Sequence, residues 1–211
     1  MNFIEVFVNP KKIVKEELKS KSFTNTLIFL LTPTILIAVL LLVFGISLNL
    51  FILFSDLLGR VLMVLLFSLS LFAVTKFVKV KKEFNYLNIF RAVSLGGFYQ
   101  VLIVLFFIFL FLTNPAYIGS LRDYSNQSIN NVQLMSNLSN AISPLGEGFN
   151  IVLLVLAAVI ALLSFAYLFI SWFFAADELF KRRFWPNLGL FIASFALYLV
   201  IMLIRTLILP F

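Results

Sequence analysis

The 211-residue sequence contains neither cysteine nor histidine. The lack of cysteine excludes disulfides, thiolate chemistry and cysteine-ligated metals. The lack of histidine removes a common zinc and haem ligand and the base of a Ser-His-Asp relay. Acidic residues number nine and lie at or beyond the ends of apolar segments, with no spacing that suggests a buried metal or an acid–base pair. We therefore expect a protein that is not an enzyme and that carries no cofactor.

Apolar residues dominate what is present, at 63% of the chain with a mean hydropathy of +1.11. A soluble domain of this length leaves too much surface in water to hide so much apolar material. Five segments are long enough for a bilayer core of about 30 Å, which takes about 20 helical residues. The sequence predicts an all-α fold, a polytopic integral membrane helical bundle with five transmembrane helices. The predicted spans are 26–44, 51–78, 88–113, 149–175 and 188–209, with residues 114–148 as an extracytoplasmic loop inside a 26–211 transmembrane domain.

Residues 1–25 precede the first span and form a basic amphipathic segment. Asn9 and Pro10 are a typical cap and first helical residue. Ile13, Val14 and Leu18 share one side of the helix that follows, which predicts a helix lying on the membrane surface with its lysines among headgroups. A polar leader that only sets orientation is the alternative.

The basic residues lie almost entirely on one side of the predicted topology. Thirteen of the sixteen Lys and Arg fall at the N-terminus, in the 76–91 stretch or in the 176–187 stretch. This bias predicts a cell-membrane protein with a cytoplasmic N-terminus and an extracytoplasmic C-terminus. It also assigns the net charge of +7 to topology and anionic lipid headgroups, and not to nucleic acid. The cytoplasmic basic clusters are Lys11, Lys12, Lys15, Lys76, Lys79, Lys81, Lys82, Lys181, Arg182 and Arg183.

The third apolar segment opens on a run of polar and small residues. Ala92 and Gly96 make a small-xxx-small pair that lets another helix approach closely. Arg91 is predicted to reach the headgroups with its long side chain. Gln100 is predicted to take part in helix packing, the alternative being ligand binding. A strip of small residues in the fourth segment suits the same close packing. The candidate packing or interaction residues are Arg91, Ala92, Ser94, Gly96, Gly97, Tyr99, Gln100, Ala157 and Ala161.

Two further features concern single side chains. Asp56 and Arg60 are four apart and form a candidate ion pair, which anchors a helix end at the outer interface or, at mid-bilayer, marks a functional site. Asp177 and Glu178 are expected to pair with Lys181 and Arg182, the alternative being a cation site. Trp172 is expected in an aromatic belt at the inner boundary.

The chain resembles prokaryotic members of the Yip (Ypt-interacting protein) domain family. The resemblance rests on Asn9-Pro10-Lys11-Lys12 before the first span, five closely spaced spans, the aromatic and arginine stretch that opens the third, and the connection from Trp172 to Gly189. It implies a non-enzymatic membrane scaffold or partner-binding protein, linked to membrane organisation or trafficking, with a protein partner or a second copy of itself.

A small membrane transporter or channel component is the alternative function. Pro33 and the Gly96-Gly97 pair are possible helix breaks of the kind that transporters use. Hydroxyls within spans mostly bond to their own backbone, however, and five spans are few for a self-contained carrier. The possible path-lining residues are Ser68, Ser70, Thr75, Ser94, Gln100, Ser164, Ser171 and Ser194.

Overall fold

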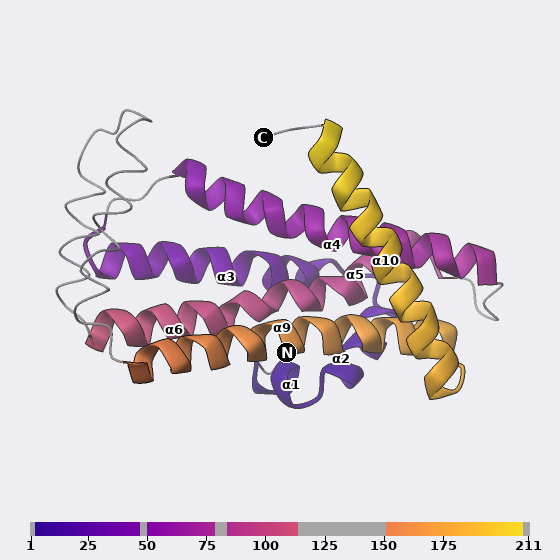
Figure 1. The fold of residues 1–211 in the computed structure, drawn as a ribbon, viewed down its shortest axis with the longest axis horizontal. Helices are drawn as coiled ribbons and strands as arrows, with labels where there is room; N and C mark the ends of the chain where they lie inside the picture. The colour runs from indigo at the N-terminus through magenta and orange to yellow at the C-terminus, as the bar shows by residue number, and fades with distance from the viewer. Residues whose placement is uncertain (1–2, 47–49, 79–83, 114–150, 209–211) are drawn as a thin grey trace. The chain divides into compact units, whose positions relative to one another are not determined.

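A computed structural model describes residues 3–46, 50–78, 84–113 and 151–208, and the described part is helical with no strand (Figure 1). The predicted extracytoplasmic loop at 114–148 lies outside these residues. The helices are α1 Phe3–Val8, α2 Pro10–Glu17, α3 Thr24–Val43, α4 Leu50–Val78, α5 Tyr86–Ser94, the 3₁₀ helix η1 Leu95–Tyr99, α6 Gln100–Thr113, α9 Ile151–Phe180 and α10 Phe184–Ile208.

Five helical stretches are long and apolar enough to cross a bilayer, which confirms the predicted all-α class and the number of spans. Large apolar side chains such as Val43, Leu162 and Leu203 are more than half exposed. Lipid is the solvent that accepts such a surface without penalty. The chain is therefore a multi-pass membrane protein. The candidate spans cover Thr24–Val43, Leu53–Val78, Tyr86–Phe106, Ala158–Phe180 and Phe184–Ile204.

The chain divides into two compact units. The second unit, Pro33–Ser55 with Gln100–Ser164, has a small core in which Leu40, Ile46 and Val104 are buried. Here α3 ends at Val43, two residues before a glycine. Gly45 has a φ of 66°, which glycine adopts without a steric penalty. The N–H of Gly45 and of Ile46 bond back to the carbonyls of Leu42 and Leu41, a paired arrangement that closes the helix end.

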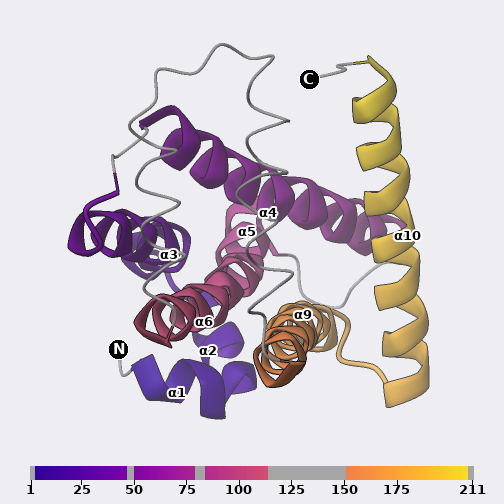
Figure 2. The ribbon, with the colours of Figure 1, turned by 60° about the vertical axis from the view of Figure 1, so that its left-hand side comes forward.

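The first unit comprises Met1–Thr32, Asp56–Tyr99 and Phe165–Phe211. Within it α2 begins as predicted, with the Asn9 side chain accepting a hydrogen bond from the Lys12 N–H and Pro10 at the first position. The apolar face of α2 is turned onto protein, because Ile13, Val14 and Leu18 are all at most 3% exposed. The prediction that this face lies in the membrane surface is wrong. Helix α5 supplies the apolar partner, and α2 lies beside α9 (Figures 1 and 2).

Helix α1 is attached to the same side of the first unit. The Tyr167 hydroxyl donates a hydrogen bond of 2.8 Å to the carbonyl oxygen of Val6, which is fully buried. The Phe7 ring packs 5.1 Å from the Tyr167 ring and 5.5 Å from the Phe98 ring, centroid to centroid. The segment 3–18 is thus a folded part of the protein and more than an orientation signal.

Seven hydroxyl groups inside the described helices bond to the backbone of their own helix. Each donates to a carbonyl three or four residues earlier, the usual way for a membrane helix to satisfy a hydroxyl. Such a hydroxyl has no donor left for a passing solute. The residues are Ser68, Ser70, Thr75, Ser94, Ser164, Ser171 and Ser194.

Candidate functional site

The glycine pair of the third span lies where the helix changes type. Helix α5 ends at Ser94, and Leu95–Tyr99 continue as the 3₁₀ helix η1. A 3₁₀ stretch inside a longer helix marks a hinge or a close approach of neighbouring groups. Residues 91–99 are all buried, so this stretch forms the centre of the first unit.

Gly96 is required because the Trp172 indole occupies the place of its missing side chain. A Cβ at Gly96 would stand 2.7 Å from Trp172 Cδ1 and 2.8 Å from Leu168 Cδ1. The indole is 1% exposed, stacks on Phe67 at 3.9 Å and donates a hydrogen bond of 3.2 Å to the Val93 carbonyl. The prediction that Trp172 sits in an aromatic belt is therefore wrong, because the glycine lets the ring enter the protein interior.

Adding one methyl group at Gly96 is expected to destabilise the fold by about 1–3 kcal/mol, the usual cost of overpacking. Gly59 is the matched control, since a Cβ there meets nothing within 4 Å. We expect Gly59→Ala to be neutral or slightly stabilising because alanine is the better helix former. Equilibrium unfolding in mixed micelles measures both, and equal effects at the two glycines would contradict the packing described.

Gly97 makes room for the side chain of Arg60. A Cβ at Gly97 would lie 3.3 Å from Arg60 Cγ and Cδ and 3.2 Å from a Leu30 methyl carbon. Arg60 donates a hydrogen bond of 2.5 Å to the Leu30 carbonyl and one of 2.5 Å to Asp56 Oδ2. Leu30 lies on α3, so the guanidinium connects α4 to α3 within the first unit.

The Asp56–Arg60 pair forms with the predicted spacing. The Arg60 side chain is fully enclosed by protein, whereas the Asp56 side chain keeps 24% exposure. Gly97 leaves room for the Arg60 side chain, and the Leu30 carbonyl accepts its hydrogen bond inside the first unit. The place of the pair, at the outer interface or at mid-bilayer, stays a prediction.

Arg91 is also buried, although the sequence predicts a side chain that reaches the headgroups. The residue is 5% exposed, hydrogen-bonds to the Asn88 side chain and lies 5.1 Å from the centre of the Phe23 ring. Its charge acts on the carboxylate of Glu17, which is 1% exposed. The snorkelling prediction is wrong because α2 covers the position from which Arg91 would reach the headgroups.

Glu17 was not anticipated as an interior residue. It lies on the apolar face of α2, four positions after Ile13, and this periodicity is the signal that could have found it. Asn25 donates a hydrogen bond of 2.6 Å to one carboxylate oxygen. Burial raises the pKa of Glu17 above its usual value, and the bond from Asn25 and the charge of Arg91 offset part of that rise.

A raised pKa makes the docking of α2 depend on pH. Because the folded state holds the proton more tightly than the unfolded state, this contribution is fully present below the ordinary carboxyl pKa and is lost as pH rises through the raised value. We expect Glu17→Gln to remove this dependence and Glu16→Gln, on the exposed side of α2, to retain it. Thermal unfolding across the acidic range checks this, and identical pH profiles for the two variants would contradict it.

The remaining predicted interaction residues are distributed as follows. Tyr99 is 8% exposed with its ring 6.2 Å from Phe165. Gln100 is the first residue of α6 and half-buried, and Ala161 is half-buried on α9. The Ala157 side chain lies outside the described part. Ala92 and Ser94 are fully buried.

Basic residues gather at one end of the first unit, where α2 meets the end of α9. Lys11 forms an ion pair of 2.8 Å with Asp177, which holds the pKa of Lys11 above its usual value. Asn187 donates a hydrogen bond of 2.5 Å to the other Asp177 oxygen. The expected pairing of Asp177 with Lys181 and Arg182 is wrong, because α2 and α10 bring closer partners from distant parts of the chain.

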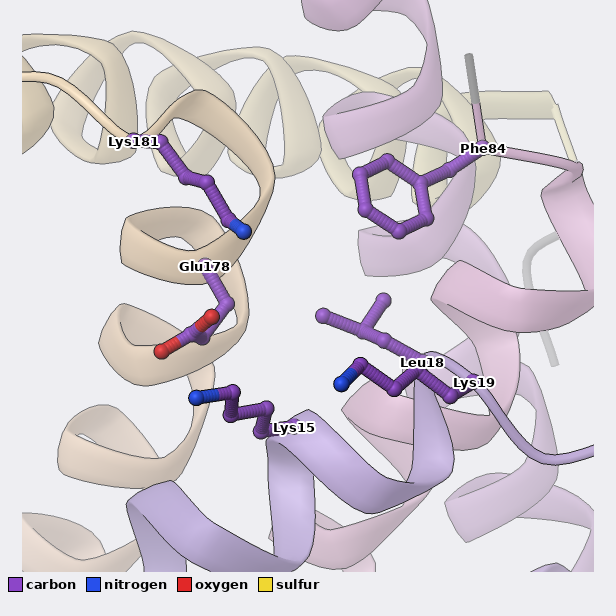
Figure 3. Close-up of a pocket in the computed structure, with 6 residues that line it drawn as sticks. All are labelled: Lys15, Leu18, Lys19, Phe84, Glu178 and Lys181. Atoms are coloured by element: carbon purple, nitrogen blue, oxygen red, sulfur yellow. The ribbon is translucent and has the colours of Figure 1, made fainter. Parts of the chain in front are cut away.

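A small cavity of about 20 Å³, open to solvent, lies beside this ion pair (Figure 3). Lys15 of α2 and Lys19, two residues after its end, approach it from one side, and Glu178 and Lys181 from the end of α9. Leu18 and Phe84 supply its apolar wall.

Among the other predicted cluster residues, Lys12 pairs with Glu5 at 2.5 Å, Arg182 donates to the Val78 carbonyl, and Lys76 and Arg183 are exposed. Lys79, Lys81 and Lys82 lie outside the described residues.

Comparison of the chain with protein-family models, with curated proteins and with solved structures gives no match. The candidate sites are therefore defined by their own geometry: a buried junction around Arg60, Gly96, Gly97 and Trp172, and a lysine-lined cavity at the end of the first unit.

Proposed function

We propose that the protein is a non-enzymatic multi-pass membrane scaffold that binds a protein partner at its basic face. The observation that carries this proposal is the docking of α1 and α2. Tyr167 and Asp177 hold the segment at two points, through Val6 and Lys11. The outer side of α2 is left as a fixed surface on which Lys12, Glu16 and Lys19 are exposed. A rigid charged surface binds a partner without the entropy cost of ordering a flexible leader.

We place this face in the cytoplasm on the distribution of basic residues, because positively charged segments are retained on that side. The resemblance to Yip-domain proteins supports the same proposal and adds a link to membrane organisation or trafficking. The partner is then a cytoplasmic or membrane protein, or a second copy of the chain.

A photo-activated cross-linker placed at Glu16 tests the proposal in native membranes. We expect one defined protein adduct, lost when Lys12 and Lys21 are changed to glutamate. The control position is Ile192 of α10, which is 57% exposed on an apolar helix and should give no discrete protein adduct. An adduct at twice the mass of the chain identifies self-association. The same set of adducts at both positions would contradict the proposal.

Transport is the second candidate, favoured by the buried Asp56–Arg60 pair and the 3₁₀ break at the glycines. Ionisable residues inside a membrane domain often belong to solute or ion pathways. Against this, Arg60 donates hydrogen bonds to Asp56 and to the Leu30 carbonyl, and seven of the eight possible path-lining residues bond to their own helices. Purified protein in liposomes decides the matter: solute flux that Gln100→Leu abolishes would favour transport over the scaffold.

A further inference from the structure

The lysine-lined cavity has more positive charge than its neighbours neutralise. Three lysines and one glutamate line it. Within the described part of the chain, Lys15, Lys19 and Lys181 have no carboxylate within ion-pair distance, whereas nearby Lys11 and Lys12 each have one. Figure 3 shows the Glu178 carboxylate between the side chains of Lys181 and Lys15. Close positive charges repel one another, so an anion that enters the cavity stabilises the arrangement.

The backbone holds one of these lysines in an unusual conformation. Lys181 has a φ of 47°, in the left-handed region that glycine or asparagine usually occupies after a helix. Its N–H still closes the last turn of α9 by bonding to the Asp177 carbonyl at 2.9 Å. From this position the Lys181 side chain extends toward the cavity (Figure 3).

The cavity also has an apolar side. Leu18 and the half-buried Phe84 line it together, so a bound group meets hydrocarbon next to the ammonium groups. The cavity lies where α9 ends and α10 begins, and its Phe84 precedes α5, so it stands at the ends of candidate membrane spans. A phosphate ester with an attached apolar chain matches both sides.

We propose that Lys15, Lys19 and Lys181 bind the phosphate group of an anionic lipid headgroup, with Leu18 and Phe84 contacting the adjoining hydrocarbon. Lysine binds phosphate as a point charge, and three lysines from two segments of the chain can surround one phosphate without a fixed hydrogen-bond geometry. The site rests on the proposed cytoplasmic position of this face, at the ends of the membrane spans, but not on the identity of any protein partner.

The test uses full-length protein in nanodiscs of phosphatidylcholine and phosphatidylglycerol in equal amounts, with retained lipid counted by native mass spectrometry. The cavity variant is Lys15→Gln, Lys19→Gln and Lys181→Gln. The control variant, Lys21→Gln, Lys76→Gln and Arg183→Gln, loses the same charge at exposed positions outside the cavity. We expect phosphatidylglycerol affinity to fall roughly a hundredfold in the cavity variant, because each lysine near an anionic surface contributes about fivefold, and to fall several-fold less in the control.

Glu178→Gln tests the same site with a single change that leaves the three lysines in place, which matters if the triple variant fails to fold. Removing the carboxylate that competes for Lys15 and Lys181 should raise phosphatidylglycerol affinity about fivefold. Glu16→Gln makes the same change of net charge outside the cavity and should have a smaller effect. Equal losses in the two triple variants together with equal gains in the two glutamate variants would overturn the site, leaving a diffuse surface charge.

Inorganic phosphate identifies the source of the ligand. In nanodiscs of phosphatidylcholine alone, acetylation of Lys15, Lys19 and Lys181 is followed with and without phosphate. If phosphatidylglycerol slows acetylation of the three lysines and inorganic phosphate does not, the ligand is a lipid. If both slow acetylation equally, the ligand is a free phosphate at the same site. Protection by polyglutamate but by neither phosphate compound would overturn the proposal in favour of an acidic protein. The cross-linking at Glu16 is independent of these outcomes, so failure of the scaffold and failure of the phosphate site are distinguishable.

Discussion

Arg60→Met is expected to destabilise the protein by about 3 kcal/mol, because it removes one member of a buried ion pair. The change deprives the Leu30 carbonyl and the Asp56 carboxylate of their bonds to the guanidinium. Breaking a pair by removing one partner costs about 3–5 kcal/mol when both groups are fully buried. We expect the lower end, since Asp56 keeps 24% exposure and can recover some solvation. Equilibrium unfolding in mixed micelles provides the measurement.

A second variant separates the charge pair from the space it fills. Adding Asp56→Leu to Arg60→Met removes the unpaired charge, and apolar replacement of a whole buried pair is often nearly neutral. The double variant should therefore recover half or more of the lost stability. Arg183→Met removes an exposed arginine and should stay within about 0.5 kcal/mol of the parent. If the double variant is less stable than Arg60→Met alone, the pair contributes more than it costs and the proposed reason is wrong.

Trp172→Ala is expected to cost about 3–5 kcal/mol, the usual range for emptying a buried tryptophan site. The indole is stacked on Phe67, donates to the Val93 carbonyl and fills the space above Gly96. The cost comes from lost contacts and the cavity, since in a membrane the apolar transfer term between protein and lipid is small. Trp172→Phe keeps an aromatic ring beside Phe67 and loses the indole hydrogen bond, so we expect it to retain most of the stability.

The second tryptophan is the control for this change. Trp185 is 76% exposed, and Trp185→Ala should remain within about 0.5 kcal/mol of the parent. The same unfolding measurement applies, with near-ultraviolet circular dichroism to report on each indole. Similar losses for the two tryptophans would show that Trp172 does not hold the third and fourth spans together as described.

Several features of the site could be read from residue spacing. The Asn9-Pro10 start of α2, the turn near Gly45, the pairing of Asp56 with Arg60 and the close packing at Gly96 all depend on residues near in sequence or on the absence of a side chain. Local geometry decides such features, because a helix fixes which residues share a face and a glycine leaves a gap wherever it lies.

Other features depended on contacts between distant segments. The apolar face of α2 suits lipid and protein equally well, so its composition could not tell which of the two covers it. Arg91 and Trp172 carry side chains that often lie at membrane interfaces, yet both are at most 5% exposed. Asp177 pairs with Lys11, 166 residues away, and not with Lys181 one turn further on. Sequence distance gave no sign of this partner.

The sequence by itself determined that the chain is a membrane-embedded all-α protein with five spans, because apolar length and composition alone fix where a chain can avoid water. The lack of cysteine and histidine also excluded the thiolate, disulfide and imidazole chemistry of those two residues. Tertiary structure alone decided that α1 and α2 fold onto the helices, that Arg60 and Arg91 lie inside, and that Lys15, Lys19 and Lys181 surround one cavity. In lipid, hydrophobicity does not distinguish inside from outside, so packing shape and hydrogen bonds between distant residues make these choices.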